Sequence, residues 1–338
     1  MDSDYKKLES LLLSGDKSNM EIALALSASQ QIKEIEDLYK NMQEVHQFWL
    51  NVPLEGYPKE LQQMIPYFKR NGINFFKNYS VRIIPENHAF LAEFIEYFYI
   101  WYTSFHSLPL GLGIFKNIRE ITVAGGPLTH IREEVWKLPE LKKIELTIGK
   151  NFIWNKSLVF AEKLEEIKLT GTVYPPLPQC LPELEGLKTF SYRSLGNPKD
   201  EMPLPEYLWK IEQLNTMSLF GKTIPMPKGG NFANLKHLKE LELNYINWDH
   251  LPESISTLSH LDKLSIFNFI KLKSLPNWFA NLKLTTLSLS NCKLNNAIEL
   301  VSKMPNLKRL IVSANIQKKS TEEIWKAALP NVELTFIQ

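Results

Sequence analysis

The sequence has little of what would assign it to several large functional classes. It contains only two cysteines, and its seven histidines are scattered without the Cys/His spacing of a metal site. No apolar run approaches the roughly 18 residues of a membrane-spanning helix. The most apolar run, residues 94–105, is too short and contains Glu96. We therefore expect no bound metal and no membrane association.

Charge of one sign is also missing. The 39 Lys and Arg residues nearly balance the 37 Asp and Glu residues, for a net charge of +2. Proteins that bind nucleic acid usually carry a concentrated basic face, so this balance argues against a nucleic-acid partner. The N-terminal sequence MDSDYKKLES is charged and has no apolar run, so we expect no secretory signal and a cytoplasmic location.

Catalytic motifs are absent as well. The sequence 221–223 (GKT) resembles the end of a phosphate-binding loop, but Thr216 stands where that loop requires a glycine. Glu133 and Glu134 are adjacent in the sequence, so their side chains diverge and cannot act as an acid/base pair. We therefore expect a non-enzymatic protein that uses no cofactor.

A repeat of 23 residues is what the sequence does contain. Residues 238–259 read LKELELNYINWDHLPESISTLS, with Leu238, Leu241 and Leu243 in the spacing L-x-x-L-x-L, and the pattern begins again at Leu261. The repeat starts are Ile95, Ile118, Leu141, Leu164, Leu187, Leu214, Leu238, Leu261, Leu284 and Leu307. Such a period predicts a solenoid in which stacked repeats share one continuous apolar core.

This pattern resembles the leucine-rich repeat (LRR) family, in the 23-residue class with an LPxxI segment, and its composition suggests a bacterial intracellular member. The resemblance implies an α/β solenoid: a right-handed superhelix, or horseshoe, with a parallel concave β-sheet of about 11 strands, preceded by an α-helical N-terminal cap. Cys180 and Cys292 lie five repeats apart, too far to bond, which predicts reduced thiols. The family usually places Asn or Cys three residues after the third leucine, and here only Cys292 and Asn315 match.

The repeat also predicts how the chain is divided. Residues 1–71 do not follow it, and residues 72–338 form the repeat domain. Within that domain we expect a divergent first repeat (72–94), regular repeats (95–331) and a terminal strand (332–338).

Apolar residues at helical spacing indicate helices in residues 1–71. Ser18 and Glu21 form a capping box that predicts the start of one helix. Pro58 suits the first turn of another, which Pro66 should shorten or kink. We interpret this segment as a cap that covers the apolar end of the solenoid, and a helical module that recruits a partner is the alternative.

Large outward-facing aromatics are the candidate binding residues, because a surface seldom clusters them without a use. Phe220, Tyr245 and Phe267 occupy outward positions at the ends of three consecutive strands, next to Asn244 and Asn268. They should form one patch that anchors a partner, unless the rings only pack on each other. We further expect Trp248, in the turn after Tyr245, to border this patch.

Three further features of the sequence lead to expectations. The charged residues of the strands alternate in sign from repeat to repeat, as at Glu240 and Lys263, which predicts a self-neutralising surface. The aromatics of residues 97–102 should pack under the helical segment. The longest repeat, 27 residues from Leu187, contains an insertion at 196–203 that could carry function or be a tolerated insertion.

The function that follows is a scaffold for protein–protein interaction. We expect a monomer that holds a protein or peptide partner on its concave sheet. Two alternatives remain open: a small-molecule or enzymatic site between the helical segment and the first repeats, and the helical segment as the recruiting module.

Overall fold

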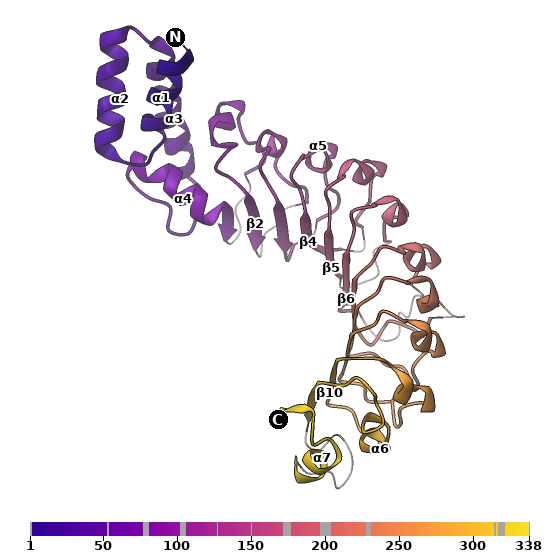
Figure 1. The fold of residues 1–338 in the computed structure, drawn as a ribbon. Helices are drawn as coiled ribbons and strands as arrows, with labels where there is room; N and C mark the ends of the chain where they lie inside the picture. The colour runs from indigo at the N-terminus through magenta and orange to yellow at the C-terminus, as the bar shows by residue number, and fades with distance from the viewer. Residues whose placement is uncertain are drawn as a thin grey trace. The chain divides into compact units, whose positions relative to one another are not determined.

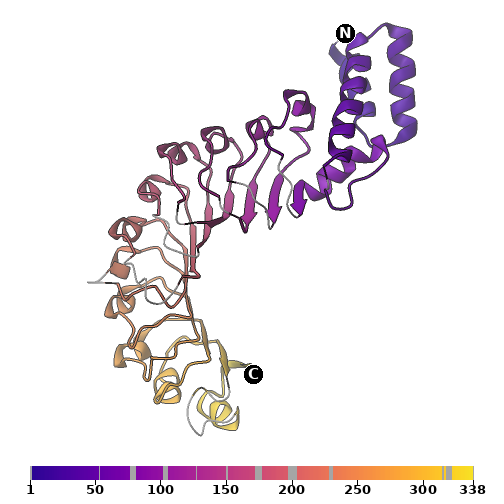
Figure 2. The same ribbon diagram turned by 180° about the vertical axis from the view of Figure 1, so that it is seen from behind.

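The fold is given by a computed structural model, which describes most of the chain (Figures 1 and 2). The described residues are 2–52, 54–76, 81–101, 106–126, 128–149, 151–171, 177–196, 204–227, 231–313, 316 and 322–337. Contacts group the chain into two compact units, Met1–Thr147 and Ile148–Gln338.

The first unit begins with the helical segment, whose first three helices pack together (Figure 1). Its elements are α1 (Asp2–Leu12), α2 (Lys17–Gln30), α3 (Lys33–Leu50), the 3₁₀ helix η1 (Leu61–Gln63) and α4 (Met64–Asn71). Two predicted boundaries differ. The cap of α2 is Asp16, which accepts a hydrogen bond from the backbone N–H of Asn19 at 2.9 Å, rather than Ser18. The helix predicted from Pro58 begins at Met64 instead, so Pro66 lies in the first turn of α4, where a helix needs no N–H. The helix is therefore short, which is one of the two effects expected of Pro66.

Aromatic side chains fill the contact between the helical segment and the first repeat. Trp49 on α3 is fully buried and packs against Phe68 and Phe75, with ring centroids 5.5 and 6.2 Å apart. His88 is also fully buried, between the rings of Phe48 and Trp49 at 4.7 and 5.5 Å. Burial lowers the pKa of His88 to about 4, because a charged imidazolium in this apolar site would lose its hydration.

One parallel sheet of twelve strands, in sequence order, contains the strands that the structure describes. The strands are β1 (Ile73–Phe76), β2 (Tyr97–Trp101), β3 (Glu120–Ala124), β4 (Lys143–Ile148), β5 (Glu166–Gly171), β6 (Thr189–Ser194), β7 (Thr216–Phe220), β8 (Glu240–Asn244), β9 (Lys263–Phe267), β10 (Thr286–Ser290), β11 (Arg309–Ser313) and β12 (Glu333–Ile337). The expected number was about 11. The divergent first repeat supplies the additional strand, because β1 pairs with β2 in register.

The connections between strands are short helices, which lie on the side of each unit away from the strands (Figures 1 and 2). They are η2 (Glu86–Leu91), η3 (Leu112–Ile114), α5 (Glu133–Trp136), η4 (Lys156–Phe160), η5 (Leu181–Glu183), η6 (Glu206–Lys210), η7 (Asn231–Asn234), η8 (Glu253–Thr257), η9 (Asn277–Asn281), α6 (Ala297–Val301) and α7 (Glu322–Ala328). The repeat leucines fill the space between the two layers.

Successive strand residues point to opposite faces of the sheet, and this alternation sorts the sequence into core and surface. In β8, Leu241 and Leu243 are buried, whereas Glu240, Glu242 and Asn244 remain partly exposed on what we call the outward face. The parallel register repeats this sorting from strand to strand, so residues in equivalent positions form rows across the sheet.

The position where the family usually carries Asn or Cys is filled differently here. Ile246, Phe269 and Cys292 occupy it and are buried. The Cys292 thiol still donates to backbone carbonyls, to Ser290 O at 3.3 Å and to Ile266 O at 3.7 Å. Burial raises the pKa of this thiol to about 11, and both cysteines are free thiols, as predicted. Asn315 lies outside the described residues.

Candidate partner-binding site

A row of backbone turns at the ends of four strands in the second unit builds the candidate site. The residue after each of β7 to β10 has a positive φ: Gly221 (138°), Tyr245 (59°), Asn268 (59°) and Asn291 (51°). In the first three the backbone N–H donates to the last carbonyl oxygen of the next strand, over 2.9 to 3.1 Å. Glycine and asparagine tolerate this conformation, but a tyrosine is strained in it.

The strained tyrosine takes part in an aromatic stack. The rings of Phe220 and Tyr245 lie nearly parallel, 17° apart, with their centroids 5.7 Å from each other. Phe220 is half-buried, whereas Tyr245 keeps 38% of its surface exposed. A conformation that costs energy and exposes a large ring is an observation that suggests function.

Two cations lie over these rings. The guanidinium carbon of Arg193 is 4.3 Å from the centroid of Phe220, and the Lys222 Nζ is 4.4 Å from that of Tyr245. Arg193 is on β6, directly opposite Phe220 in the register. Lys222 holds the position that Ile246, in the next repeat, buries in the core.

Asparagine side chains continue the site along the same edge. Asn291 Nδ2 donates to Asn268 Oδ1 at 2.6 Å, and Asn268 Nδ2 donates to Asn244 Oδ1 at 3.0 Å. Phe267 is half-buried and lies opposite Asn244. The structure thus places five of the six predicted residues on one edge. We call the strand-end patch the set Arg193, Phe220, Lys222, Asn244, Tyr245, Phe267 and Asn268.

The sixth predicted residue, Trp248, does not border the patch. It is 3% exposed, its indole Nε1 donates to the carbonyl oxygen of Ile224 at 3.0 Å, and its ring packs edge-on against Phe269. The prediction was wrong because the turn after Tyr245 leads back into the core. Arg193, Lys222 and Asn291 were missed, although Arg193 shares a row with Phe220 and Asn291 one with Asn268.

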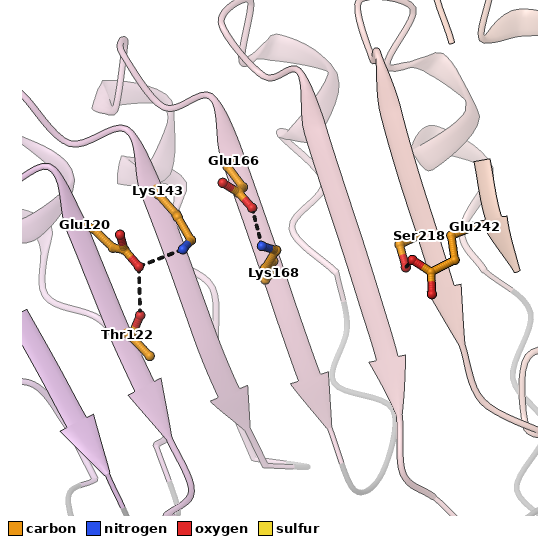
Figure 3. Close-up of polar contacts among 7 residues, drawn as sticks. All are labelled: Glu120, Thr122, Lys143, Glu166, Lys168, Ser218 and Glu242. Carbon is orange, nitrogen blue, oxygen red and sulfur yellow. Dashed lines mark hydrogen bonds and ion pairs between the residues drawn. The ribbon is translucent and has the colours of Figure 1, made fainter. Parts of the chain in front are cut away.

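The charged rows of the outward face neutralise themselves, as predicted. Lys143 Nζ lies 2.7 Å from Glu120 Oε1 in the first unit, and Lys263 Nζ lies 2.6 Å from Glu240 Oε1 in the second. Lys168 pairs with Glu166 along its own strand, as Figure 3 shows. Exposed pairs of this kind contribute about 0–1 kcal/mol each, so they leave little free charge and add little stability.

The remaining sequence candidates have different outcomes. Tyr97 and Tyr99 are half-buried on the outward face of β2 and stack on each other, with ring centroids 6.0 Å apart, so they alternate with the core residues of that strand. Burial, with a contribution from Glu120, raises the pKa of Tyr99 to about 12. Tyr102 and residues 197–203 of the insertion lie outside the described residues.

Hollows of the structure lie away from this patch. One of about 690 Å³ is lined by Phe152, Ile153, Trp154, Tyr207 and neighbouring side chains of the second unit. Where the alternative hypothesis placed a pocket, Trp49 and Phe75 fill the space.

No group of three or more His, Cys, Asp or Glu that could hold a metal occurs among the described residues. None of the described helices is both long and apolar enough to cross a membrane.

Comparison with known proteins places the chain in a structural class. No protein-family model matches it. A putative disease resistance protein of Arabidopsis thaliana is 34% identical over 136 residues, which are 40% of this chain. The chain spans only 11% of the length of that curated relative.

Three solved structures are similar to the chain at low sequence identity. A chain of the Drosophila Toll–Spätzle complex is 14% identical with a TM-score of 0.50, over 78% of this chain and 36% of that one. An internalin from Listeria monocytogenes is 15% identical with a TM-score of 0.44, over 89% and 95%. An LRR protein of Leptospira interrogans is 16% identical with a TM-score of 0.39, over 82% and 99%.

The repeat and the parallel sheet together define the fold. Twelve described strands, joined mostly by short helices at intervals of about 23 residues, form an α/β solenoid. The chain has the fold of leucine-rich repeat proteins.

Proposed function

We propose that this protein is a non-enzymatic scaffold that binds a protein or peptide partner on the outward face of its sheet, with the strand-end patch as the anchor. In repeat proteins of this kind that face is the concave one, and stacked repeats present it as an extended binding surface. The solved complex of Toll with Spätzle is a related fold in a protein assembly.

The observation that carries the proposal is the exposed, strained Tyr245 in its stack with Phe220. Interface hot spots are enriched in Tyr, Trp and Arg and are surrounded by polar groups. The strand-end patch has this composition, since Tyr245, Phe220 and Arg193 adjoin two asparagines. Elsewhere in the second unit the outward face is largely occupied by charge pairs and small hydroxyl side chains.

The double variant F220A/Y245A tests this proposal. We expect cross-linking capture from a lysate of the source organism, read by mass spectrometry, to lose the partners that the wild-type chain recovers. Ile153→Ala is the matched control, because Ile153 is 70% exposed and belongs to the hollow rather than the patch.

The two variants also separate the competing surfaces. Partners lost from I153A but kept by a folded F220A/Y245A protein would move the binding site to the hollow. Deleting residues 2–71 tests the recruiting-module alternative. If the helices only cap the solenoid, the deletion uncovers Phe75 and the truncated chain aggregates, whereas loss of a separate module leaves it soluble.

A further inference from the structure

The outward faces of β6 and β7 differ from those of the neighbouring strands in the second unit. Their outward residues are Thr189, Ser191, Arg193, Thr216, Ser218 and Phe220, so Arg193 is the one charged group among them. Charge pairs lie on either side of these two strands, Glu166 with Lys168 on β5 and Glu240 with Lys263 on β8 and β9. Arg193 is therefore a cation with no acidic residue beside it in its row of the sheet.

Arg193 and Lys222 face rings rather than carboxylates. Neither forms an ion pair with another described residue, and each lies over a ring, Arg193 over Phe220 and Lys222 over Tyr245. A ring face attracts a cation but takes up none of its N–H donors, which stay available to an anion. The nearest carboxylate on β8, that of Glu242, accepts a hydrogen bond from Ser218 Oγ at 3.3 Å.

Resting on the proposed function, we propose that the strand-end patch recognises an extended acidic segment of a partner protein, in which a carboxylate lies close to an apolar side chain. The carboxylate binds between Arg193 and Lys222 through charge-assisted hydrogen bonds, and the apolar side chain lies against the exposed part of Tyr245. The asparagines of the patch, which both donate and accept, bind the backbone of the segment.

The spacing of the strands sets the length of this segment. Neighbouring strands are about 4.8 Å apart, so the patch extends about 14 Å from β6 to β9. An extended chain advances about 3.3 Å per residue, and about four or five residues cross that distance. The carboxylate lies between β6 and the turn after β7, about one strand spacing from Tyr245 at the end of β8, which places the acidic residue one or two positions from the apolar one.

Panning a random 12-residue peptide library on the immobilised full chain tests the inference. We expect the enriched peptides to carry Asp or Glu within two residues of Phe, Tyr, Trp or Leu. A synthesised peptide from this pool should bind at least about tenfold more weakly to R193Q/K222Q than to the wild-type chain, and more weakly as salt rises. Its Glu→Gln form should lose a similar factor.

Two control variants accompany this measurement. K263Q removes a cation that is paired with Glu240 and should leave the affinity unchanged. E242Q removes the carboxylate that accepts from Ser218 and should bind the peptide at least as tightly, since an acidic neighbour repels an acidic ligand. Weaker binding by E242Q, or an equal loss in K263Q, would contradict recognition of a carboxylate by these two cations.

The outcomes separate this inference from the function on which it rests. The enriched peptides could lose binding to Y245A and yet carry no acidic residue. That result would overturn recognition of an acidic segment but leave the proposed scaffold function standing. Peptides that bind Y245A and R193Q/K222Q as tightly as the wild-type chain would overturn both the acidic-segment inference and the proposed function of the patch. Binding only to vesicles of phosphatidylserine and phosphatidylcholine, with no peptide enriched, would replace the acidic segment with a membrane surface and also overturn it.

Discussion

Two aromatic clusters, one in each compact unit, show opposite uses of the same kinds of residue. In the first unit Trp49, Phe68 and Phe75 are completely buried around a neutral His88. In the second, Phe220 and Tyr245 stack at the surface with cations over their rings. The rings of the first cluster contact one another and the apolar core, whereas those of the second border solvent.

The difference shows which cluster stabilises the fold and which is available for binding. Burying a large ring removes apolar surface from water and stabilises the fold. Leaving Tyr245 exposed at a positive φ gains little for the fold and offers the ring to a partner instead. Substitutions in the first cluster should therefore change stability, and those in the second should change binding.

The largest expected effect is on the buried cluster. Trp49→Ala leaves a cavity between the helical segment and the first repeat, and the free energy of unfolding should fall by about 3–5 kcal/mol. Urea unfolding followed by circular dichroism measures it. Leu50→Ala on the same helix is the control, because Leu50 is 41% exposed and its loss should cost under about 1 kcal/mol. Equal losses in the two variants would show that the cluster has no special role.

An intermediate effect should appear in the pH dependence of stability. The unfolded chain protonates His88 near pH 6.5, whereas the folded chain protonates it only near pH 4, so the unfolded state binds more protons in between. The contribution of neutral His88 is therefore complete above pH 6.5 and falls as the pH drops toward 4, by about 3 kcal/mol.

Replacing the imidazole with a ring that cannot titrate isolates this contribution. H88F should have a flatter dependence of unfolding free energy on pH between 6.5 and 4 than the wild-type chain. His260→Gln serves as the control for replacing an exposed imidazole. A slope in H88F equal to that of the wild type would assign the acid sensitivity to other groups.

The smallest effect on stability should come from the exposed cluster. In Tyr245→Asn, relief of the left-handed conformation gains about 1–2 kcal/mol, and loss of the ring contacts costs about as much. The unfolding free energy should therefore change by less than about 1 kcal/mol, while partner binding falls sharply. A loss of stability above about 2 kcal/mol would make Tyr245 a structural residue and remove the contrast between the clusters.

Where the leucine spacing is regular, the sequence predicts which residues of neighbouring strands lie side by side in the sheet. The pairing of Lys263 with Glu240 and the adjacency of Phe220, Asn244 and Phe267 follow from counting 23 or 24 residues along a parallel register. Local signals were less reliable at element boundaries, because several residues can cap one helix. Asp16 and Ser18 both suit the start of α2, and the preference between them depends on the preceding turn.

The sequence by itself determined the repeat, the parallel sheet and the separation of core leucines from surface residues, because an apolar period of this length permits few other ways to bury its side chains. Only the tertiary structure decided that Trp248 turns inward, that Lys222 leaves a core position to lie over Tyr245, and that Trp49 closes the space between helices and repeats. Those outcomes depend on backbone turns and on contacts between residues far apart in the sequence, which no local spacing encodes.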